Sequence, residues 1–154
     1  MANIGENRIS GGPVEFALSY RYLDGGRPGL ANADQGVCIQ VVADVGGEET
    51  ELLRFDCFDN EPHYHYFSEE KRERLMMDKT TAGNPIGWTM NQLREKLPEM
   101  LTRTGHKDLA AKAKGKALEP KLDEVESAAR ELAASKRNTV THKRGDVVIE
   151  AGAI

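Results

Sequence analysis

A chain of 154 residues, of which 39% are hydrophobic and 30% charged, suffices for one compact domain or for a domain of about 100 residues with an appendage. The net charge of −4 argues against a general affinity for nucleic acid, and no hydrophobic run approaches the roughly 18 residues of a membrane span. Because residues 1–12 lack the pattern of a signal peptide and two cysteines are too few for a disulfide scaffold, we expect a cytoplasmic protein with reduced thiols.

The N-terminal half of the chain predicts antiparallel strands. Residues 1–12 are polar and Gly-rich, show no periodicity, and are expected to be flexible. From Pro13 the pattern changes, because hydrophobic side chains then alternate with polar or small ones as far as Tyr22. Such alternation is typical of a half-buried strand. Residues 24–29 predict a loop, and a second strand is expected over residues 36–45.

Gly46 and Gly47 predict a hairpin turn into a third strand over residues 49–58. A slip of one residue turns every side chain of a strand to the other face, so the faces test the register. A three-residue loop, 46–48, pairs the hydrophobic side chains with one another: Val41 with Leu53, Ile39 with Phe55, and Val37 with Cys57. In this register Cys38 and Cys57 face opposite sides of the sheet, and we expect no disulfide between them.

A fourth strand is expected over residues 62–67, after the turn 59–61, and its pairing with the third strand is set by counting a four-residue loop. That loop places Asp56 directly opposite His65, and Tyr66 opposite Phe55. The face away from the hydrophobic side chains then carries one set of residues: Arg54, Asp56, Phe58, His63 and His65. The charged run over residues 69–74 has mixed signs and is interpreted as a solvated surface.

The second half of the chain predicts helices. Asn84 as N-cap and Pro85 at the first helical position begin one of them. Its hydrophobic residues recur at spacings of three and four and can cover the sheet: Ile86, Met90, Leu93, Leu97 and Leu101. Pro98 should kink or end this helix, and Gly105 is a suitable stop.

A short Ala- and Lys-rich helix is expected over residues 107–117, and a longer one from about Glu119. The hydrophobic stripe of the longer helix is narrow and close to heptad spacing: Leu118, Leu122, Val125, Ala129 and Leu132. We therefore expect an exposed helix that binds a protein partner or a second copy of the chain through this stripe. Residues 147–149 could form a late strand without an evident neighbour.

Together these patterns predict an α+β fold, a four-stranded antiparallel β-meander covered by an amphipathic helix, with a helical C-terminal extension. The predicted organisation is a flexible N-terminus over residues 1–12, an α+β domain over 13–104, the helical extension over 105–138 and a tail over 139–154.

Two histidines and a carboxylate are the candidates for chemistry. His63 and His65 are two residues apart, so their side chains project from the same face of an extended strand, with Asp56 across from them. Three protein ligands suffice for a catalytic zinc, and a histidine oriented by a carboxylate can act as a general base. Arg54 lies in the same set, and His106 or Asp59 could add a fourth ligand.

A structural role for this set is the alternative that we favour at this point. Cross-strand pairs of opposite charge stabilise sheets by about 0.2–1 kcal/mol each, and His-x-His is a short and common pattern. We therefore expect no cofactor, with a divalent metal as the alternative. The glycine loops match neither a P-loop nor a dinucleotide motif, and there is no nucleophile elbow. A lysine patch lacks interleaved aromatic residues, which argues against nucleic acid as a partner: Lys112, Lys114, Lys116 and Lys121.

Several motifs between Val14 and Leu101 resemble a family of small uncharacterised prokaryotic proteins. They are Leu53-Arg54-Phe55-Asp56-Cys57-Phe58, Pro62-His63-Tyr64-His65-Tyr66, Gly83-Asn84-Pro85-Ile86-Gly87-Trp88 and Leu97-Pro98-Glu99-Met100-Leu101. The order of strand, turn, His-x-His and helix is more distantly similar to TumE-type toxin-like proteins. This chain lacks their Lys-Gly-His-His type turn and adds a C-terminal segment. The closer resemblance implies no particular activity.

Two classes of function follow as hypotheses. The leading one is a binding or assembly module without enzymatic activity, because no catalytic signature is present and the C-terminal stripe is thin. The alternative is a metal-dependent or general-base enzyme, or a toxin-like protein that acts on RNA, with Asp56, His63 and His65 at its centre.

Overall fold

The computed structural model describes residues 2–23, 33–78, 84–136, 140–143 and 146–149. The strands are β1 (Ala2–Ser10), β2 (Glu15–Leu23), β3 (Asp34–Val45), β4 (Glu48–Phe58), β5 (His63–Phe67), β6 (Arg72–Met76), β7 (Val140–Lys143) and β8 (Asp146–Ile149). The helices are α2 (Pro85–Arg103), α3 (Lys107–Lys112) and α4 (Glu119–Lys136).

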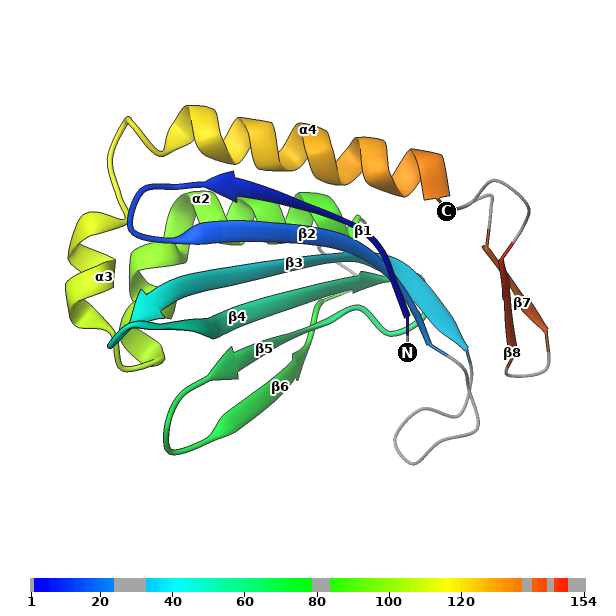
Figure 1. Ribbon diagram of the computed structural model, residues 1–154, viewed down its shortest axis with the longest axis horizontal. Helices are drawn as coiled ribbons and strands as arrows, with labels where there is room; N and C mark the ends of the chain where they lie inside the picture. Colours follow the sequence, from blue (N-terminus) through cyan, green and yellow to red (C-terminus); the bar gives the residue numbers. More distant parts are fainter. Residues whose placement is uncertain (1, 24–32, 79–83, 137–139, 144–145, 150–154) are drawn as a thin grey trace.

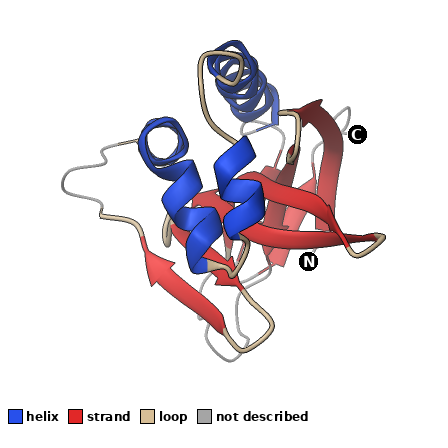
Figure 2. Ribbon diagram, turned by 90° about the vertical axis from the view of Figure 1, so that its left-hand side faces the viewer, coloured by secondary structure: helices blue, strands red, loops and turns tan. Residues whose placement is uncertain are grey.

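A six-stranded antiparallel sheet, in the order β1 to β6, forms one layer of the molecule. Helices α2 and α4 pack against each other and against one face of this sheet (Figures 1 and 2). The predicted α+β class, with an antiparallel sheet and C-terminal helices, is confirmed. The predicted number of four strands is wrong, because one strand is added at each edge.

The first added strand is β1, which corrects the expectation that residues 1–12 are flexible. It pairs with β2 along its length, with one register shift between Ile4 and Glu6. An edge strand needs backbone pairing on one side only, so it can form without a regular hydrophobic alternation. Arg8 also ties β1 to the rest of the sheet, through ion pairs with Glu49 and Glu15.

The second added strand is β6, formed by part of the run of mixed charges that was expected to be a solvated surface. It pairs with β5. Arg72, Arg74 and Met76 are exposed, whereas Glu73 and Leu75 alternate with them and are half-buried. Charged side chains are common on edge strands, where they prevent pairing with other chains.

The hairpin between β3 and β4 has the predicted side-chain pairs but a different loop. Val41 lies opposite Leu53, as predicted. The loop contains only Gly46 and Gly47, whose φ angles of 63° and 89° suit the tight turn that most residues avoid. A register shift between Val41 and Val42 supplies the extra residue. The predicted three-residue loop is therefore wrong, because a bulge in the strand has the same effect on the faces.

The register between β4 and β5 differs from the prediction by two residues. Asp56 lies opposite His63 rather than His65. The Asp34 carboxylate at the start of β3 accepts hydrogen bonds from the backbone N–H groups of Asn60 and Glu61, both at 2.9 Å. These bonds hold the intervening turn against β3. Because the shift is an even number of residues, every side chain keeps its predicted face.

Helix α2 begins and ends as predicted. The Asn84 side chain accepts a hydrogen bond from the Gly87 N–H at 3.1 Å, and Gly105 follows the helix with a φ of 93°. The helix continues through Pro98 as far as Arg103, so of the two expected effects of Pro98, a kink or an end, the end does not occur. The predicted stripe faces the sheet and is buried: Ile86, Met90, Leu93, Leu97 and Leu101.

Helix α4 packs on the sheet instead of projecting from it. It contacts β1, β2, β3 and α2. Of the predicted partner-binding residues, Leu132 is partly buried. The other four are buried in the common core: Leu118, Leu122, Val125 and Ala129. The expectation of an exposed helix is therefore wrong, because the sheet is wide enough for two helices. A partner-binding role for this stripe stays a prediction, and it would require α4 to leave the sheet.

The remaining elements are short. Helix α3 ends at Lys112, earlier than the predicted 117. The predicted late strand at residues 147–149 lies in β8, and its neighbour is β7. In the part of the chain that the structure describes, no helix has both the length and the hydropathy that crossing a membrane requires.

Candidate metal centre

The two faces of the sheet differ in chemistry. The face under α2 and α4 is hydrophobic, whereas the opposite face carries polar side chains that are nevertheless buried: Ser19, Arg21, Cys38, Asp56 and His63. A buried charge is costly unless another group compensates it. The contacts of the charged members of this set therefore define the candidate site.

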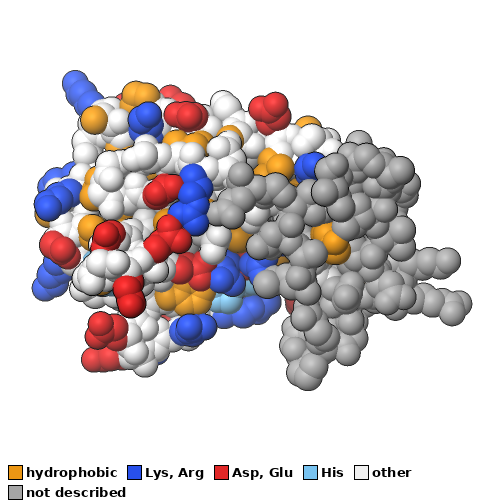
Figure 3. All heavy atoms as spheres, viewed as in Figure 1, with side chains coloured by type: hydrophobic (Ala, Val, Ile, Leu, Met, Phe, Trp, Pro, Cys, Tyr) orange, Lys and Arg blue, Asp and Glu red, His pale blue; other side chains and the backbone are white. Residues whose placement is uncertain are grey.

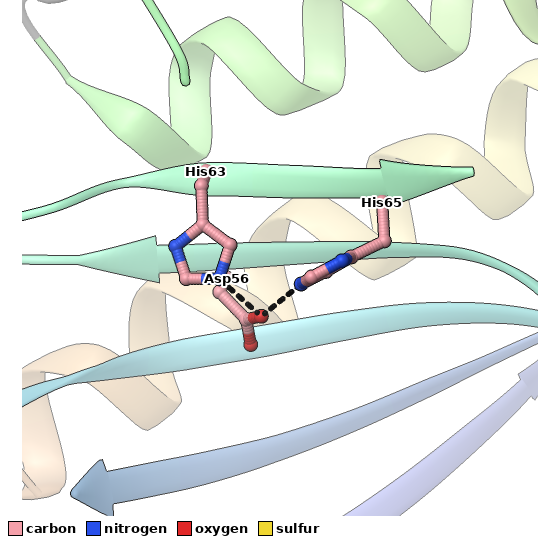
Figure 4. A group of neighbouring side chains, drawn as sticks. All are labelled: Asp56, His63 and His65. Atoms are coloured by element: carbon pink, nitrogen blue, oxygen red, sulfur yellow. Dashed lines mark ion pairs between the residues drawn. The ribbon is translucent and has the colours of Figure 1, made fainter. Parts of the chain in front are cut away.

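Asp56 is the centre of these contacts, with a side chain that is 2% exposed. Its Oδ1 accepts a hydrogen bond from Arg21 Nη1 at 2.8 Å. Its Oδ2 lies 3.1 Å from His63 Nε2 and 3.5 Å from His65 Nε2 (Figure 4). The three potential ligand atoms of Asp56, His63 and His65 all lie within 4.8 Å of one another. The predicted cluster therefore forms, even though the register differs.

The environment keeps Asp56 ionised. Burial alone would raise the pKa of this carboxyl group, but the adjacent His63 and His65 side chains and the charge of Arg21 together lower the pKa well below its usual value of 3.8. Asp56 is consequently a carboxylate throughout the physiological pH range. A carboxylate with one oxygen held by Arg21 presents the other oxygen, Oδ2, to the two histidines.

His63 has a hydrogen bond that fixes the roles of its ring nitrogens. Its Nδ1 lies 2.7 Å from the Glu61 carbonyl oxygen. A carbonyl can only accept, so Nδ1 carries the proton, and in the neutral ring Nε2 carries a lone pair. That lone pair points at Asp56 Oδ2. The two groups repel each other unless a proton or a metal ion lies between them.

The two distances from Asp56 Oδ2 to the imidazole nitrogens are compatible with a metal ion. Two ligand atoms that are each about 2.0–2.1 Å from a tetrahedral zinc ion lie roughly 3.3 Å apart. The separations of 3.1 Å and 3.5 Å between Asp56 Oδ2 and the two imidazole nitrogens are on either side of this value. The Nδ1 bond of His63 to a backbone carbonyl is also the usual support of a metal-binding imidazole.

The other candidate residues lie outside the cluster. Arg54 is opposite His65 on the same face, and its guanidinium binds the Glu51 carboxylate at 2.6 Å and 3.0 Å. His106 precedes α3 as its N-cap, and Asp59 is an exposed residue of the turn after β4. Neither belongs to the group of ligand atoms around Asp56.

The two cysteines are free and lie on opposite faces, as predicted. Burial and the neighbouring Asp56 carboxylate raise the pKa of the Cys38 thiol. Burial raises the pKa of Cys57 to about 12, and its sulfur contacts Thr89 Oγ1 at 3.4 Å under α2. Both thiols therefore stay protonated and are poor metal ligands, since a thiolate is the binding form.

Sequence reasoning missed Arg21. Its position in the alternation of β2 puts it on the polar face, together with Ser19, and a lone arginine in a hydrophobic strand could have indicated a buried partner. The alternation could not identify that partner, because Arg21 reaches over β3 to Asp56 on β4. Gly36 lies directly opposite Arg21 on β3, at a position without room for a side chain, since a Cβ there would lie 2.1 Å from the Cys57 carbonyl oxygen.

Comparison with known proteins gives one match. Residues 8–129 match the family described as Domain of unknown function (DUF7700). No curated protein and no solved structure matches the chain. At the level of a family without an assigned activity, the match agrees with the closer resemblance in the sequence, and nothing in these comparisons confirms the similarity to TumE-type proteins.

Proposed function

This chain belongs to the DUF7700 family, and we propose that it is a metal-dependent enzyme that binds one divalent transition-metal ion through Asp56, His63 and His65. The observation that carries the proposal is the convergence of both imidazole Nε2 atoms on one oxygen of an ionised carboxylate, 3.1 Å and 3.5 Å away. When the His63 ring is neutral, the proton on Nδ1 leaves the Nε2 lone pair directed into this space.

The chemistry of the three ligands supports a transition metal. Imidazole nitrogens suit Zn²⁺ and Fe²⁺, whereas Mg²⁺ and Ca²⁺ prefer oxygen ligands. Two histidines and one carboxylate occur at catalytic zinc sites and at non-haem iron sites, where the remaining positions are left to water or substrate. A centre with three protein ligands is therefore suited to catalysis, whereas structural zinc sites have four.

The side of the cluster next to His65 is the more accessible one. The His65 side chain is 18% exposed, compared with 9% for His63 and 2% for Asp56. Figure 3 shows a histidine at the surface over β5 and β6, beside Lys and Arg side chains. Water or a substrate would therefore reach the metal past His65.

A metal-free centre is the alternative. In that case His63 carries protons on both nitrogens and pairs with Asp56 as an imidazolium ion. If His65 Nε2 donates to Asp56 Oδ2, its Nδ1 has a lone pair and can act as a general base. The contact of 3.5 Å is long for such a hydrogen bond, which favours the metal.

Metal titration tests the proposal. We expect the untagged protein, after chelator treatment, to bind about one equivalent of Zn²⁺ or Co²⁺ in isothermal titration calorimetry. His65→Ala should weaken binding by more than about 100-fold, since outer-shell changes alone cost about 10–100-fold. His106→Ala is the matched control, because it removes an imidazole outside the cluster. Circular dichroism verifies that both variants fold. Equal binding by both variants would refute the assignment of the site.

A further inference from the structure

His65 lies between two arginines. In the pairing of β4, β5 and β6, Arg54 is opposite His65 on one side and Arg74 is opposite His65 on the other. Residues that are opposite each other in antiparallel strands project from the same face of the sheet. Two guanidinium groups therefore flank the more exposed ligand of the candidate metal centre.

Phe67 brings a third arginine into this group. Its ring is stacked on the His65 ring at 5.4 Å with an interplanar angle of 9°. The guanidinium carbons of Arg54 and Arg72 lie over the same ring, 5.3 Å and 5.5 Å from its centroid. Cation–π contacts of this kind orient the side chains, so Phe67 holds two guanidinium groups next to His65. We call Arg54, Arg72 and Arg74 the arginine rim.

The arginine rim has donors that no carboxylate uses. Within the described residues, Arg54 forms an ion pair with Glu51, but Arg72 and Arg74 form none. Both are exposed, and among the residues that the structure describes Arg74 has one hydrogen bond, to the Met76 sulfur at 3.4 Å. Arg72 and Arg74 are two residues apart on β6, so both project from the site face, roughly 7 Å apart. This spacing lets both guanidinium groups reach one tetrahedral anion.

We propose that the arginine rim binds the phosphate group of a small phosphate ester, and that this ester is the substrate of the metal centre. The statement that the ester is the substrate of the metal centre rests on the proposed function, whereas phosphate binding by the arginine rim does not. The planar fork of a guanidinium matches two phosphate oxygens, and a metal ion beside His65 would bind a third and polarise the phosphorus centre. The arginine rim lies beside the metal ligands, because His65 is one of these ligands and is also opposite Arg54 and Arg74.

A small ester fits this surface better than a nucleic acid. The chain has a net charge of −4, and the turn before β6 carries the exposed Glu69 and Glu70. These charges repel a polyanion that continues past the first phosphate. The Phe67 ring is also covered by His65 and two arginines, so it offers no free face on which a base could stack.

Ligand binding to the full-length protein tests the inference. Inorganic phosphate, a nucleoside monophosphate and a short oligoribonucleotide are titrated by calorimetry into chelator-treated protein and into protein with one equivalent of Zn²⁺. We expect the inorganic phosphate and the monophosphate to bind, and Arg72→Gln with Arg74→Gln to lower their affinity at least about 10-fold. The control, Lys112→Gln with Lys114→Gln, removes the same charge from exposed positions on and after α3 and should bind as the wild type does.

The outcomes separate this inference from the proposed function. Phosphate binding that depends on Arg72 and Arg74 in a protein without affinity for Zn²⁺ would support the rim and refute the metal centre. Equal phosphate binding by the two double variants would overturn the rim, whatever the metal does. An oligoribonucleotide that binds more tightly than the monophosphate would overturn the assignment to a small ester.

Discussion

At the scale of single residues, the pair of Arg21 and Asp56 holds the polar face together. The two side chains are 7% and 2% exposed, and their charges are 2.8 Å apart. Removing one partner of a buried pair leaves the other charge without compensation. Arg21 therefore compensates the charge of Asp56, although it does not belong to the group of candidate ligand atoms.

We expect Arg21→Met to lower the free energy of unfolding by about 3–5 kcal/mol, as measured by urea denaturation in the presence of a chelator. The control is Arg103→Met, since Arg103 pairs with Glu73 at the surface and an exposed pair contributes at most about 1 kcal/mol. Similar losses in the two variants would contradict the role given to Arg21.

Cys57 gives a prediction for alkaline pH. Burial raises its pKa from 9.0 to about 12. Between these values the unfolded chain binds fewer protons than the folded one, so the free energy of unfolding falls as the pH rises, by about 1.4 kcal/mol per pH unit. Cys57→Ser keeps a polar group next to the Thr89 hydroxyl, but the serine side chain does not titrate in this pH range. Its unfolding free energy should fall less steeply than that of the wild type between pH 9 and 11.

The corresponding measurement is urea denaturation at several pH values, with wild type and variant compared at each. Other groups also titrate in this range, and the comparison cancels them because both proteins contain them. Identical slopes for the two proteins would show that Cys57 ionises as readily in the folded state as in the unfolded chain.

At the scale of elements, sequence patterns predicted faces better than registers. Alternation in β2, β3, β4 and β5 assigned Asp56, His63 and His65 to one face, and the structure agrees. The register of β4 and β5 depends on a turn, and that turn is held by Asp34, which is distant in sequence. Local periodicity carries no information about such a contact. The candidate site was therefore predictable as a set of residues but not as a geometry.

Asp34 is expected to control that register. Its carboxylate accepts three backbone hydrogen bonds at 2.9 Å, from Gln35, Asn60 and Glu61. Asp34→Ala leaves these N–H groups without their acceptor, and we expect a loss of unfolding free energy of at least about 2 kcal/mol. Because the turn positions His63 opposite Asp56, affinity for Zn²⁺ should fall as well.

The control for this variant is Asp44→Ala, which removes an acceptor for one backbone N–H in the exposed turn after β3. It should cost less stability and leave metal affinity unchanged. If Asp34→Ala binds Zn²⁺ as the wild type does, the turn has no part in positioning the ligands.

At the scale of the whole molecule, α2 and α4 share one hydrophobic core with the sheet. The stripe of α2 was predicted to cover the sheet, because its spacing is that of an ordinary amphipathic helix. The stripe of α4 was assigned to a partner, because it is narrow and rich in alanine. Small side chains are what a second helix needs beside α2, and only the width of a six-stranded sheet makes room for it. On the side of the sheet where α4 packs, that width came from β1, a strand that the sequence patterns did not indicate.

We therefore expect Leu122→Ala to lower the free energy of unfolding by about 2–5 kcal/mol, as a large cavity in a core does. Glu131→Ala, on the exposed side of α4, should change it by no more than about 0.5 kcal/mol. Urea denaturation compares the two. An independent helical arm would instead unfold without affecting the sheet, and Leu122→Ala would then leave the main transition unchanged.

The central claim is that Asp56, His63 and His65 share one metal ion. Its most direct measurement is anomalous diffraction at the zinc edge, from crystals of the protein grown with Zn²⁺. We expect a single strong peak about 2.0–2.2 Å from Asp56 Oδ2 and from Nε2 of both histidines. A map without a peak there, in which His63 and His65 remain in direct contact with the carboxylate, would contradict the claim and leave a buried network of charges in its place.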